Sequence, residues 1–430
     1  MMTETDKRNQ FIVDPSKPMS AVLIMVCIYI FLFIERPWES IRYLEGIQIE
    51  RIYAIALIIV AFLAGRFKIV SSTTNKWVYG LLAMHFILAP FAYRTEFAID
   101  QGVEYAKMVV LYLLMVSLVD DEHSLKILVK AYVFSTMFYS LHSLWEYHNG
   151  RHVWTMGISR MMGADSTFSD PNAFGASLVL SLPFAYALFR SEISSRLRQL
   201  YCGYFGIVVL CVVLTGSRSA SVALIVLLLM WSLLQQGKNK FVILAAMLLA
   251  FSTVWINMPA EKQERIRSIW DKDAGPENAH ESTDGRRLGF NAGLEMFLRA
   301  PLTGIGAGGK NFVEYRKNRL DGVPEQAHNL YAEVLGELGL GGALFFIGLV
   351  ASNLCSCLKV RQHYHLSEMA NSFCSELSRA IIVSVVLLLI FGLAGHNFYR
   401  PLWLWLSAWA GGLMQILNQK ESSISKTEVY

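Results

Sequence analysis

The chain has 430 residues, of which 54% are hydrophobic and 17% are charged, and its mean hydropathy is +0.39. Soluble domains carry about 25% charged residues, so the composition argues against a soluble protein and indicates a membrane protein. The net charge of +4 is spread over many loops with no long basic run, which argues against a nucleic-acid partner.

Apolar segments of spanning length recur along the whole chain. Crossing the hydrocarbon core takes about 20 residues of helix. The first segment follows a polar stretch and has no small-residue cleavage site after it, which favours an uncleaved span over a signal peptide. We predict an all-α polytopic protein of twelve transmembrane helices at 19–35, 47–64, 77–92, 103–119, 125–146, 173–190, 199–215, 219–235, 240–257, 328–353, 379–395 and 401–418.

The chain is expected to have four parts, and the charges of its loops predict their orientation. Helices 1–9 occupy 1–257, a large and partly helical loop 258–327, helices 10–12 occupy 328–418, and a tail 419–430. The positive-inside rule places lysine- and arginine-rich loops in the cytoplasm. Both termini are then cytoplasmic and the large loop is periplasmic. The charges that indicate this are Arg66, Lys68, Lys76, Arg190, Arg196, Arg198, Lys238, Lys240, Lys359, Arg361, Arg379, Lys420 and Lys426.

No metal or nucleotide cofactor is expected. The pattern Cys355-x-Cys357 with His363-x-His365 fits no established zinc spacing. The glycine-rich segment 301–309 has no preceding strand, and it faces away from cytosolic nucleotides, so a nucleotide-binding loop is a poor interpretation.

A polar break, Thr215-Gly-Ser-Arg218-Ser-Ala220, separates two apolar segments on the periplasmic side. An arginine there costs several kcal/mol if it faces lipid, so Arg218 should point into a cavity or the membrane interface. The alternative is an arginine whose side chain reaches the lipid headgroups.

In the large loop, Arg286 and Arg287 begin an amphipathic helix. Arg286 shares a stripe with Phe290, Leu294 and Phe297, and that stripe is expected to pack on the membrane domain. Arg286 should therefore face the protein, and Arg287 should be a solvated surface charge.

His328 opens the tenth predicted span, followed by Asn329. A helix N-terminus disfavours an imidazolium, which leaves a neutral ring able to accept a proton. The alternative is a histidine that only caps the span at the interface. Deeper in that span, Glu333 and Glu337 share a face. They indicate either a polar cavity or an ion pair, for which Lys107 of the fourth span is the candidate partner.

Two inward arginines and one base on the same side suit an anionic, phosphate-bearing substrate. Guanidinium groups bind diphosphate oxygens in bidentate fashion. A histidine can take the proton of an attacking hydroxyl. The residues alone thus indicate an enzyme acting at the periplasmic face.

At these residues the sequence resembles the O-antigen ligase and O-antigen polymerase superfamily, bacterial envelope glycosyltransferases that use undecaprenyl diphosphate. The family's most specific pattern, His328-Asn-x9-Gly-x-x-Gly342, is complete, and Phe290 stands where the family often has tryptophan. The remaining matches are Ser166–Phe174, Thr215–Arg218, Gly285–Phe290 and Pro301–Gly306.

The resemblance implies an inner-membrane protein of the lipid-dependent glycosyltransferase type, an inverting reaction, no cofactor and no metal. It implies that Arg218 and Arg286 bind the diphosphate and that His328 acts on the acceptor. The expected partners are an undecaprenyl-diphosphate-linked glycan as donor, lipid A-core or a growing glycan as acceptor, and membrane lipid. As substrate-binding residues we further predict Arg160, Asp170, Asn172, Arg287, Asn329 and Lys107.

Two choices stay open. A ligase and an exopolysaccharide or O-antigen polymerase need the same donor chemistry, and the complete histidine pattern favours the ligase. A transporter of lipid-linked sugars or anions is compatible with intramembrane Lys107, Glu333 and Glu337. Such transporters usually contain structural repeats, and the sequence shows none.

Overall fold

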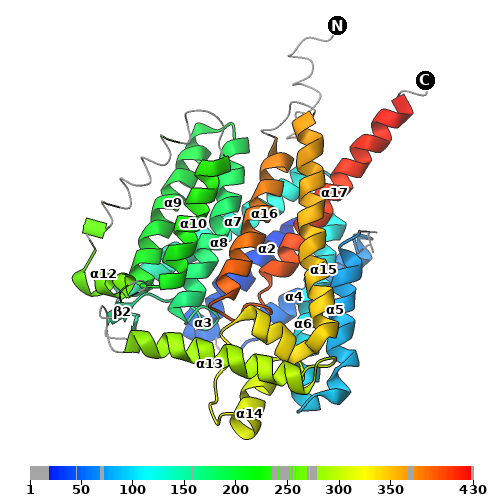
Figure 1. The fold of residues 1–430 in the computed structure, drawn as a ribbon. Helices are drawn as coiled ribbons and strands as arrows, with labels where there is room; N and C mark the ends of the chain where they lie inside the picture. Colours follow the sequence, from blue (N-terminus) through cyan, green and yellow to red (C-terminus); the bar gives the residue numbers. More distant parts are fainter. Residues whose placement is uncertain are drawn as a thin grey trace.

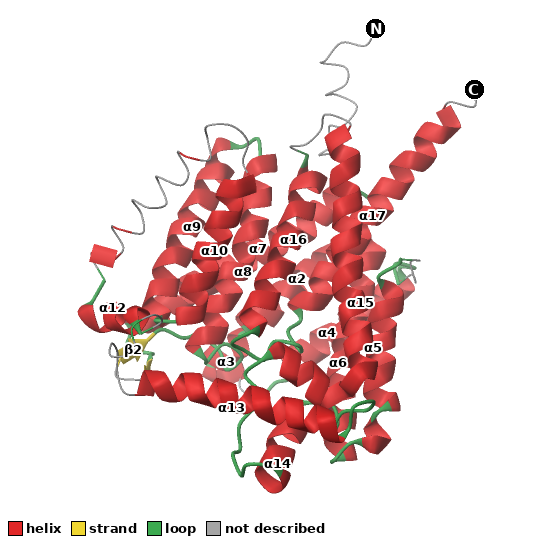
Figure 2. Ribbon diagram, viewed as in Figure 1, coloured by secondary structure: helices red, strands yellow, loops and turns green. Residues whose placement is uncertain are grey.

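A computed structural model describes residues 19–427 except 45, 68–71, 156–157, 235–240, 242–251, 253–254, 257, 269–270, 272–277 and 367–371. The described chain is almost entirely helical (Figures 1 and 2). The short strands β1 (Val153–Thr155) and β2 (Ile158–Arg160) pair antiparallel, with Val153 opposite Arg160. The protein is thus an all-α membrane protein.

The predicted apolar segments coincide with helices, except 240–257, most of which lies outside the described residues. The helix that corresponds to the predicted segment 103–119 is α6, and it begins eight residues earlier, at Thr95. Charged residues in its first turns lower the local hydropathy, so the prediction missed them. The helices are α2 (Ala21–Glu35), α3 (Pro37–Ser40), η1 (Arg42–Leu44), α4 (Ile49–Leu63), α5 (Asn75–Ile87), η2 (Ala89–Phe91), α6 (Thr95–Leu118), α7 (Glu122–His148), α8 (Pro171–Ser191), α9 (Ser195–Thr215), α10 (Arg218–Leu234), α12 (Ala260–Arg267), α13 (Asn278–Arg299), α14 (Gly309–Arg319), α15 (Leu330–Leu366), α16 (Phe373–Gly392) and α17 (Leu402–Thr427).

Several of these helices meet the requirement for crossing a bilayer. Six described helices are long and apolar enough to span, namely Ala21–Ser40, Thr95–Leu118, Pro171–Ser191, Ser195–Thr215, Leu330–Tyr364 and Phe373–Gly392. The chain is therefore a multi-pass membrane protein.

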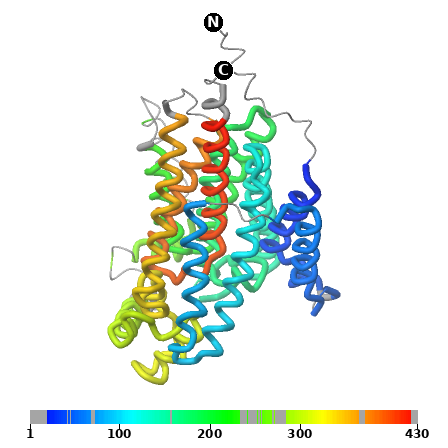
Figure 3. The backbone as a smooth tube through the Cα atoms, turned by 90° about the vertical axis from the view of Figure 1, so that its right-hand side faces the viewer, coloured from blue at the N-terminus to red at the C-terminus, as the bar shows by residue number. Residues whose placement is uncertain are grey.

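The long helices form an upright bundle, and α13 lies across one end of it (Figure 1). The helices α12 and α14 and the strand β2 lie at that same end, while α15 and α17 end at the opposite one. In the view turned by 90°, α13 and α14 again lie at that end, and α2 and α4 form one edge (Figure 3). The described parts of the polar segment 258–327 therefore cover one end of the bundle.

Aromatic side chains fill the centre of the bundle where α7, α8 and α17 meet. The ring of Trp409 packs 4.9 Å from Phe184 and 5.5 Å from Tyr132, centroid to centroid. Tyr132 also meets Trp405 edge to face at 5.5 Å. Edge-to-face pairs of this kind add to the large apolar area that each ring buries.

The helix α15 is broken at Gly339, whose φ of 59° and ψ of −157° are not helical. The glycine-rich segment 301–308 pairs with the backbone groups around the break. The amide of Leu340 donates to the carbonyl of Pro301 at 2.8 Å, and the amide of Ile305 donates to Gly336 at 2.9 Å. Helix breaks at membrane depth persist only where such partners satisfy the freed groups. The glycine-rich segment is thus part of the helix packing.

The expected ion pair between Lys107 and the α15 carboxylates is wrong. Lys107 instead pairs with Glu104 at 2.6 Å on the exposed face of α6. The Glu337 carboxylate accepts from the Gly308 amide and the Tyr399 hydroxyl, both at 2.6 Å, and Glu333 accepts from the Phe398 amide at 3.1 Å. Backbone amides and a hydroxyl therefore satisfy carboxylates that we expected a lysine to balance.

A substitution at Gly304 tests the packing of the glycine-rich segment. Its φ is +64°, and a Cβ there would lie 2.3 Å from the backbone of Glu337. Gly304→Ala should lower the free energy of unfolding by roughly 2–5 kcal/mol, from backbone strain and overpacking. Denaturant unfolding in detergent micelles measures this loss.

The matched control is Gly322→Ala. Gly322 also has a positive φ, +75°, but nothing lies within 4 Å of a Cβ there. That variant should lose only the strain, about 1–2 kcal/mol. Equal losses in the two variants would contradict the close packing of Gly304 against α15.

Candidate active site

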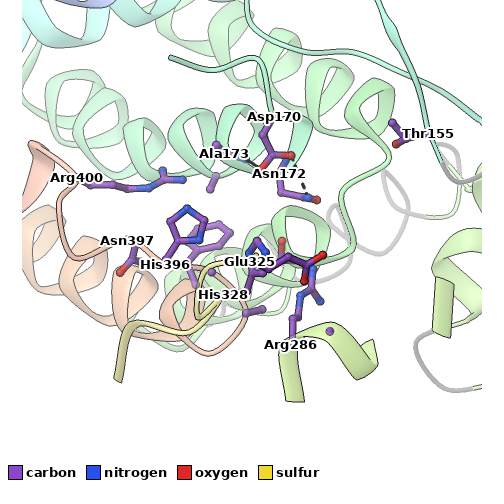
Figure 4. Close-up of a pocket in the computed structure, with 16 residues that line it drawn as sticks. Thr155, Asp170, Asn172, Ala173, Arg286, Glu325, His328, His396, Asn397 and Arg400 are labelled. Atoms are coloured by element: carbon purple, nitrogen blue, oxygen red, sulfur yellow. Dashed lines mark hydrogen bonds between the residues drawn. The ribbon is translucent and has the colours of Figure 1, made fainter. Parts of the chain in front are cut away.

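A cavity of about 560 Å³ opens at the end of the bundle that α13 crosses (Figure 4). Its wall comes from the end of β1, the starts of α8 and α10, the helix α13, the segment before α15, and the end of α16 with the loop that follows it. Its polar wall consists of Thr155, Asp170, Asn172, Ser219, Arg286, Glu325, His328, His396, Asn397 and Arg400.

Asp170 and Asn172 line this cavity at the N-terminus of α8. The Asp170 carboxylate accepts from the amides of Asn172 and Ala173 at 3.1 and 3.2 Å, so it caps the helix. The carbonyl oxygen of the Asn172 side chain accepts from Arg160 at 2.9 Å. Two predicted binding residues thus face the cavity, while Arg160 lies behind Asn172, with 3% of its surface exposed.

His328 projects into the cavity from a strained backbone. Its φ is +47°, which non-glycine residues rarely adopt and which costs on the order of 1–3 kcal/mol. The next residue, Asn329, holds this turn, because its side-chain oxygen accepts from the amides of Tyr331 and Ala332 at 3.0 and 3.1 Å. Its side-chain nitrogen donates to the carbonyl of Leu393 at 3.1 Å.

Asn329 was expected to bind substrate, and its contacts point to another role. Both ends of its amide are engaged within the protein, and 7% of the residue is exposed. It also does not line the cavity. Its position at the helix N-terminus makes it a cap, so it orients His328.

The surroundings of His328 keep its ring neutral. Burial lowers the pKa of His328, the Glu325 carboxylate opposes this shift, and Arg286 adds to it. The His396 ring lies 5.1 Å away, centroid to centroid. The protein around His396 desolvates it and lowers its pKa to about 4, with a smaller contribution from His328. Neutral imidazoles at this place can accept protons.

The two arginines of α13 face different ways. Arg286 lines the cavity and points up from α13 into it (Figure 4), whereas Arg287 is exposed and does not line it. Burial lowers the pKa of Arg286, and the carboxylate of Asp170 opposes the shift. Of these two predicted binding residues, Arg286 lines the cavity and Arg287 does not.

The apolar stripe of α13 does not pack as expected. Phe290 and Leu294 are each 40% exposed. The face that packs carries small residues instead, since a Cβ on Gly289 would lie 2.5 Å from the Ala327 carbonyl and one on Gly293 would lie 2.7 Å from the Ala332 carbonyl. Small residues let the backbones of α13 and α15 approach closely, which larger side chains would prevent.

Arg218 lies at the edge of the cavity rather than in its wall. It begins α10, and its guanidinium donates to the Ser268 hydroxyl at 3.2 Å. The next residue, Ser219, lines the cavity. Ser217 caps α10, because its hydroxyl accepts from the Ala220 amide at 3.3 Å. The polar break of the sequence is thus a tight turn between two helices.

Four arginines come close enough to repel one another. Burial and the charges of Arg160, Arg218 and Arg286 together lower the pKa of Arg265 to about 9, and burial is the largest of these causes. The pKa of Arg160 is lowered to about 10, chiefly by burial. The carboxylate of Asp170 raises this pKa, and the charges of Arg218 and Arg286 lower it. A cluster of like charges of this kind attracts anions.

Sequence reasoning missed His396, Arg400 and Arg265. Arg400 lines the cavity from the loop before α17, and burial lowers its pKa against the opposing charge of Asp170. An arginine in a short loop between two apolar segments is the signal that identified Arg218. Applied to the sequence around Pro401, the same signal would have found Arg400.

A second cavity of about 430 Å³ adjoins the first. The two share Ala173, His396, Asn397 and Arg400 in their walls. Six aromatic rings contribute to the wall of the second, namely Phe33, Tyr132, Tyr139, Phe168, Tyr399 and Trp405, together with polar residues such as Gln101, Gln326 and Glu333. A charged, polar cavity therefore adjoins one that has more aromatic side chains in its wall.

A family model described as O-Antigen ligase matches residues 203–347. The matched range extends from within α9 to within α15 and contains Arg218, Arg286 and His328. Over that range it confirms the resemblance inferred from the sequence. Comparison with curated proteins finds no match.

Proposed function

We propose that this chain, whose residues 203–347 match the O-antigen ligase family, transfers a glycan from undecaprenyl diphosphate to an acceptor hydroxyl. The observation that carries the proposal is the cavity whose wall brings Arg286, Arg400 and His328 together with the carboxylates of Asp170 and Glu325. The family match supports activity of the O-antigen ligase or polymerase type. The preferred reaction is that of a ligase, with lipid A-core as the acceptor.

The proposed reaction is one inverting displacement, with no metal required. His328 takes the proton of the acceptor hydroxyl, and the oxygen attacks the anomeric carbon of the donor sugar. The bond from that carbon to the diphosphate breaks, and undecaprenyl diphosphate leaves with the electron pair. Because negative charge grows on the leaving group, Arg286 and Arg218 stabilise the transition state more than the bound substrate.

The adjoining cavities suit a substrate with one polar and one apolar part. The diphosphate fits the cavity with Arg286 and Arg400, and a polyprenyl chain fits the aromatic wall next to it. Asp170 lies where it can hydrogen-bond a sugar hydroxyl. Arg287 and Lys107 lie outside this arrangement, and we assign them no substrate contact.

We further propose twelve spans with cytoplasmic termini and a periplasmic site. The positive-inside rule supports this orientation. The candidate site lies at the end of the bundle opposite to the end of α15 that carries Lys359 and Arg361.

Cysteine labelling tests the orientation. In a cysteine-free background, Asp284→Cys and Asn318→Cys should react with a membrane-impermeant maleimide in intact spheroplasts. Ser194→Cys, in the short connection between α8 and α9, should not. All three positions are exposed, so accessibility within the protein is not limiting. Labelling of Ser194→Cys alone would reverse the orientation.

The two adjacent arginines of α13 test the diphosphate site. Arg286→Ala should lower the turnover number by about 10²–10³, the usual loss for one preorganised electrostatic group. Arg287→Ala should change it by less than about threefold, because an exposed charge contributes little. Glycan transfer by purified variants in detergent gives both values. A larger loss from Arg287→Ala would show that the other face of α13 meets the donor.

The pH dependence of transfer tests His328 as the base. His328→Ala should cost about 10²–10⁴ in turnover. A base acts when deprotonated, and burial lowers the pKa of His328, so the acid limb of kcat/KM should lie below the ordinary value of about 6.5.

Glu325 also contributes to the position of that limb, against the larger effect of burial. Its carboxylate raises the pKa of His328, so Glu325→Gln should move the acid limb to still lower pH. Glu295→Gln removes an exposed carboxylate of α13 that pairs with Arg299, and it should leave the limb in place. An upward shift in Glu325→Gln would exclude His328 as the group that titrates.

The glycan profile of a deletion strain distinguishes the ligase from the polymerase. A strain lacking a ligase should keep long glycan chains on undecaprenyl diphosphate and leave the lipid A-core bare. A strain lacking a polymerase should carry core with a single repeat unit, or exported polymer limited in the same way. Single-repeat core would therefore favour the polymerase and leave the proposed site unchanged.

A further inference from the structure

Three cations from two separate segments bind three successive carbonyl groups at the end of α9. Lys262 donates to the carbonyl of Leu214 at 3.1 Å, and Arg160 donates to that of Thr215 at 2.8 Å. Arg265 donates to the carbonyl of Gly216 at 2.9 Å. We call these three cations the carbonyl clasp. They are 7%, 3% and 3% exposed, so these contacts are made within the protein.

The clasp holds the turn from which Arg218 projects. Gly216 has a φ of +57°, and a Cβ there would lie 2.9 Å from Ile158, so the turn is tightly enclosed. Arg218 in turn contacts Ser268, and the Ser268 hydroxyl donates to the carbonyl of Arg265 at 2.7 Å. The helix α12 thus contacts the turn both through the clasp and through Arg218.

The end of α9 is an unfavourable place for an anion. The last carbonyls of a helix carry a partial negative charge, equivalent to roughly half an electron. The diphosphate proposed for Arg218 would lie close to these carbonyls. The N-terminus of α10, which starts at Arg218, has the opposite polarity and attracts anions. One turn therefore places a repelling helix end beside an attracting one.

Arg265 places a positive charge beside this turn, although its hydrogen bond to the Gly216 carbonyl does not require one. Its Nε serves the Gly216 carbonyl, while its Nη1 is buried and, among the described residues, has no hydrogen-bond partner. Burial of a guanidinium nitrogen without a partner is costly. A purely structural contact to one carbonyl would need only a neutral donor.

We propose that Arg160, Lys262 and Arg265 are positioning residues that cancel the negative end of α9, so that Arg218 and the N-terminus of α10 accept a diphosphate. The proposal rests on the proposed function, because it assumes a diphosphate beside Arg218. It assigns the clasp no contact with the reacting atoms. Its consequence is that the charge of Arg265 matters for donor affinity, in addition to its hydrogen bond.

Two substitutions at Arg265 separate charge from hydrogen bond. Glutamine places its amide nitrogen where the Nε of arginine lies, so Arg265→Gln keeps a donor for the Gly216 carbonyl and removes the charge. Arg265→Lys keeps a positive charge and loses the Nε donor. Arg267→Ala is the matched control, since Arg267 is an exposed arginine on the same helix.

The experiment measures the Kd of each purified full-length variant for undecaprenyl diphosphate, together with its unfolding temperature and kinetic constants. Arg265→Gln should bind about tenfold more weakly, as expected for loss of one partly buried charge at a helix end. Its unfolding temperature should remain near that of the unmodified protein. Arg265→Lys should recover most of the affinity, and Arg267→Ala should bind normally.

The outcomes separate this inference from the proposed function. If Arg265→Gln binds as well as Arg267→Ala while Arg218→Ala binds poorly, the inference is overturned and the proposed function stands. Equal losses of affinity in Arg265→Gln and Arg265→Lys, with a lowered unfolding temperature, would show that the clasp only supports the structure. That result would also overturn the inference. If the unmodified protein fails to bind undecaprenyl diphosphate, or Arg218→Ala binds normally, both proposals fail.

Discussion

The mutual repulsion of guanidinium groups at one end of the bundle is the constraint on which the rest of the site depends. Arg160, Arg218, Arg265 and Arg286 lie within electrostatic range of one another. Carbonyl oxygens at the end of α9 and the carboxylate of Asp170 offset part of this repulsion. The remainder is consistent with the diphosphate that we propose as ligand.

Holding these groups in place requires backbone that is rigid in unusual conformations. The positive φ of His328 persists because Asn329 caps α15 and also bonds the loop before α17. The break at Gly339 persists because the segment 301–308 satisfies its free backbone groups. Preorganisation of this kind reduces the reorganisation that a reaction would otherwise require. Gly339, the first glycine of the pattern that begins at His328, is therefore the residue at which α15 breaks.

Hydropathy and helical phase predicted much of this protein, and they failed where backbone contact decides the packing. The apolar segments became helices, and the phase of α13 separated Arg286 from Arg287. The same phase wrongly buried Phe290 and Leu294, because a hydropathy pattern ignores that Gly289 and Gly293 allow the closest approach. Local sequence likewise does not show which distant loops come together, so the sequence analysis missed Arg400.

The family match and the cavity do not cover the same part of the chain. Residues 203–347 supply Arg218, Arg286 and His328, the groups proposed for the diphosphate and the proton. The opposite wall comes from outside that range, from Asp170 at the start of α8 and from the loop before α17. That loop also borders the second cavity. The family match therefore covers the groups that we propose for the donor, and it leaves out the walls formed by α8 and by the loop before α17.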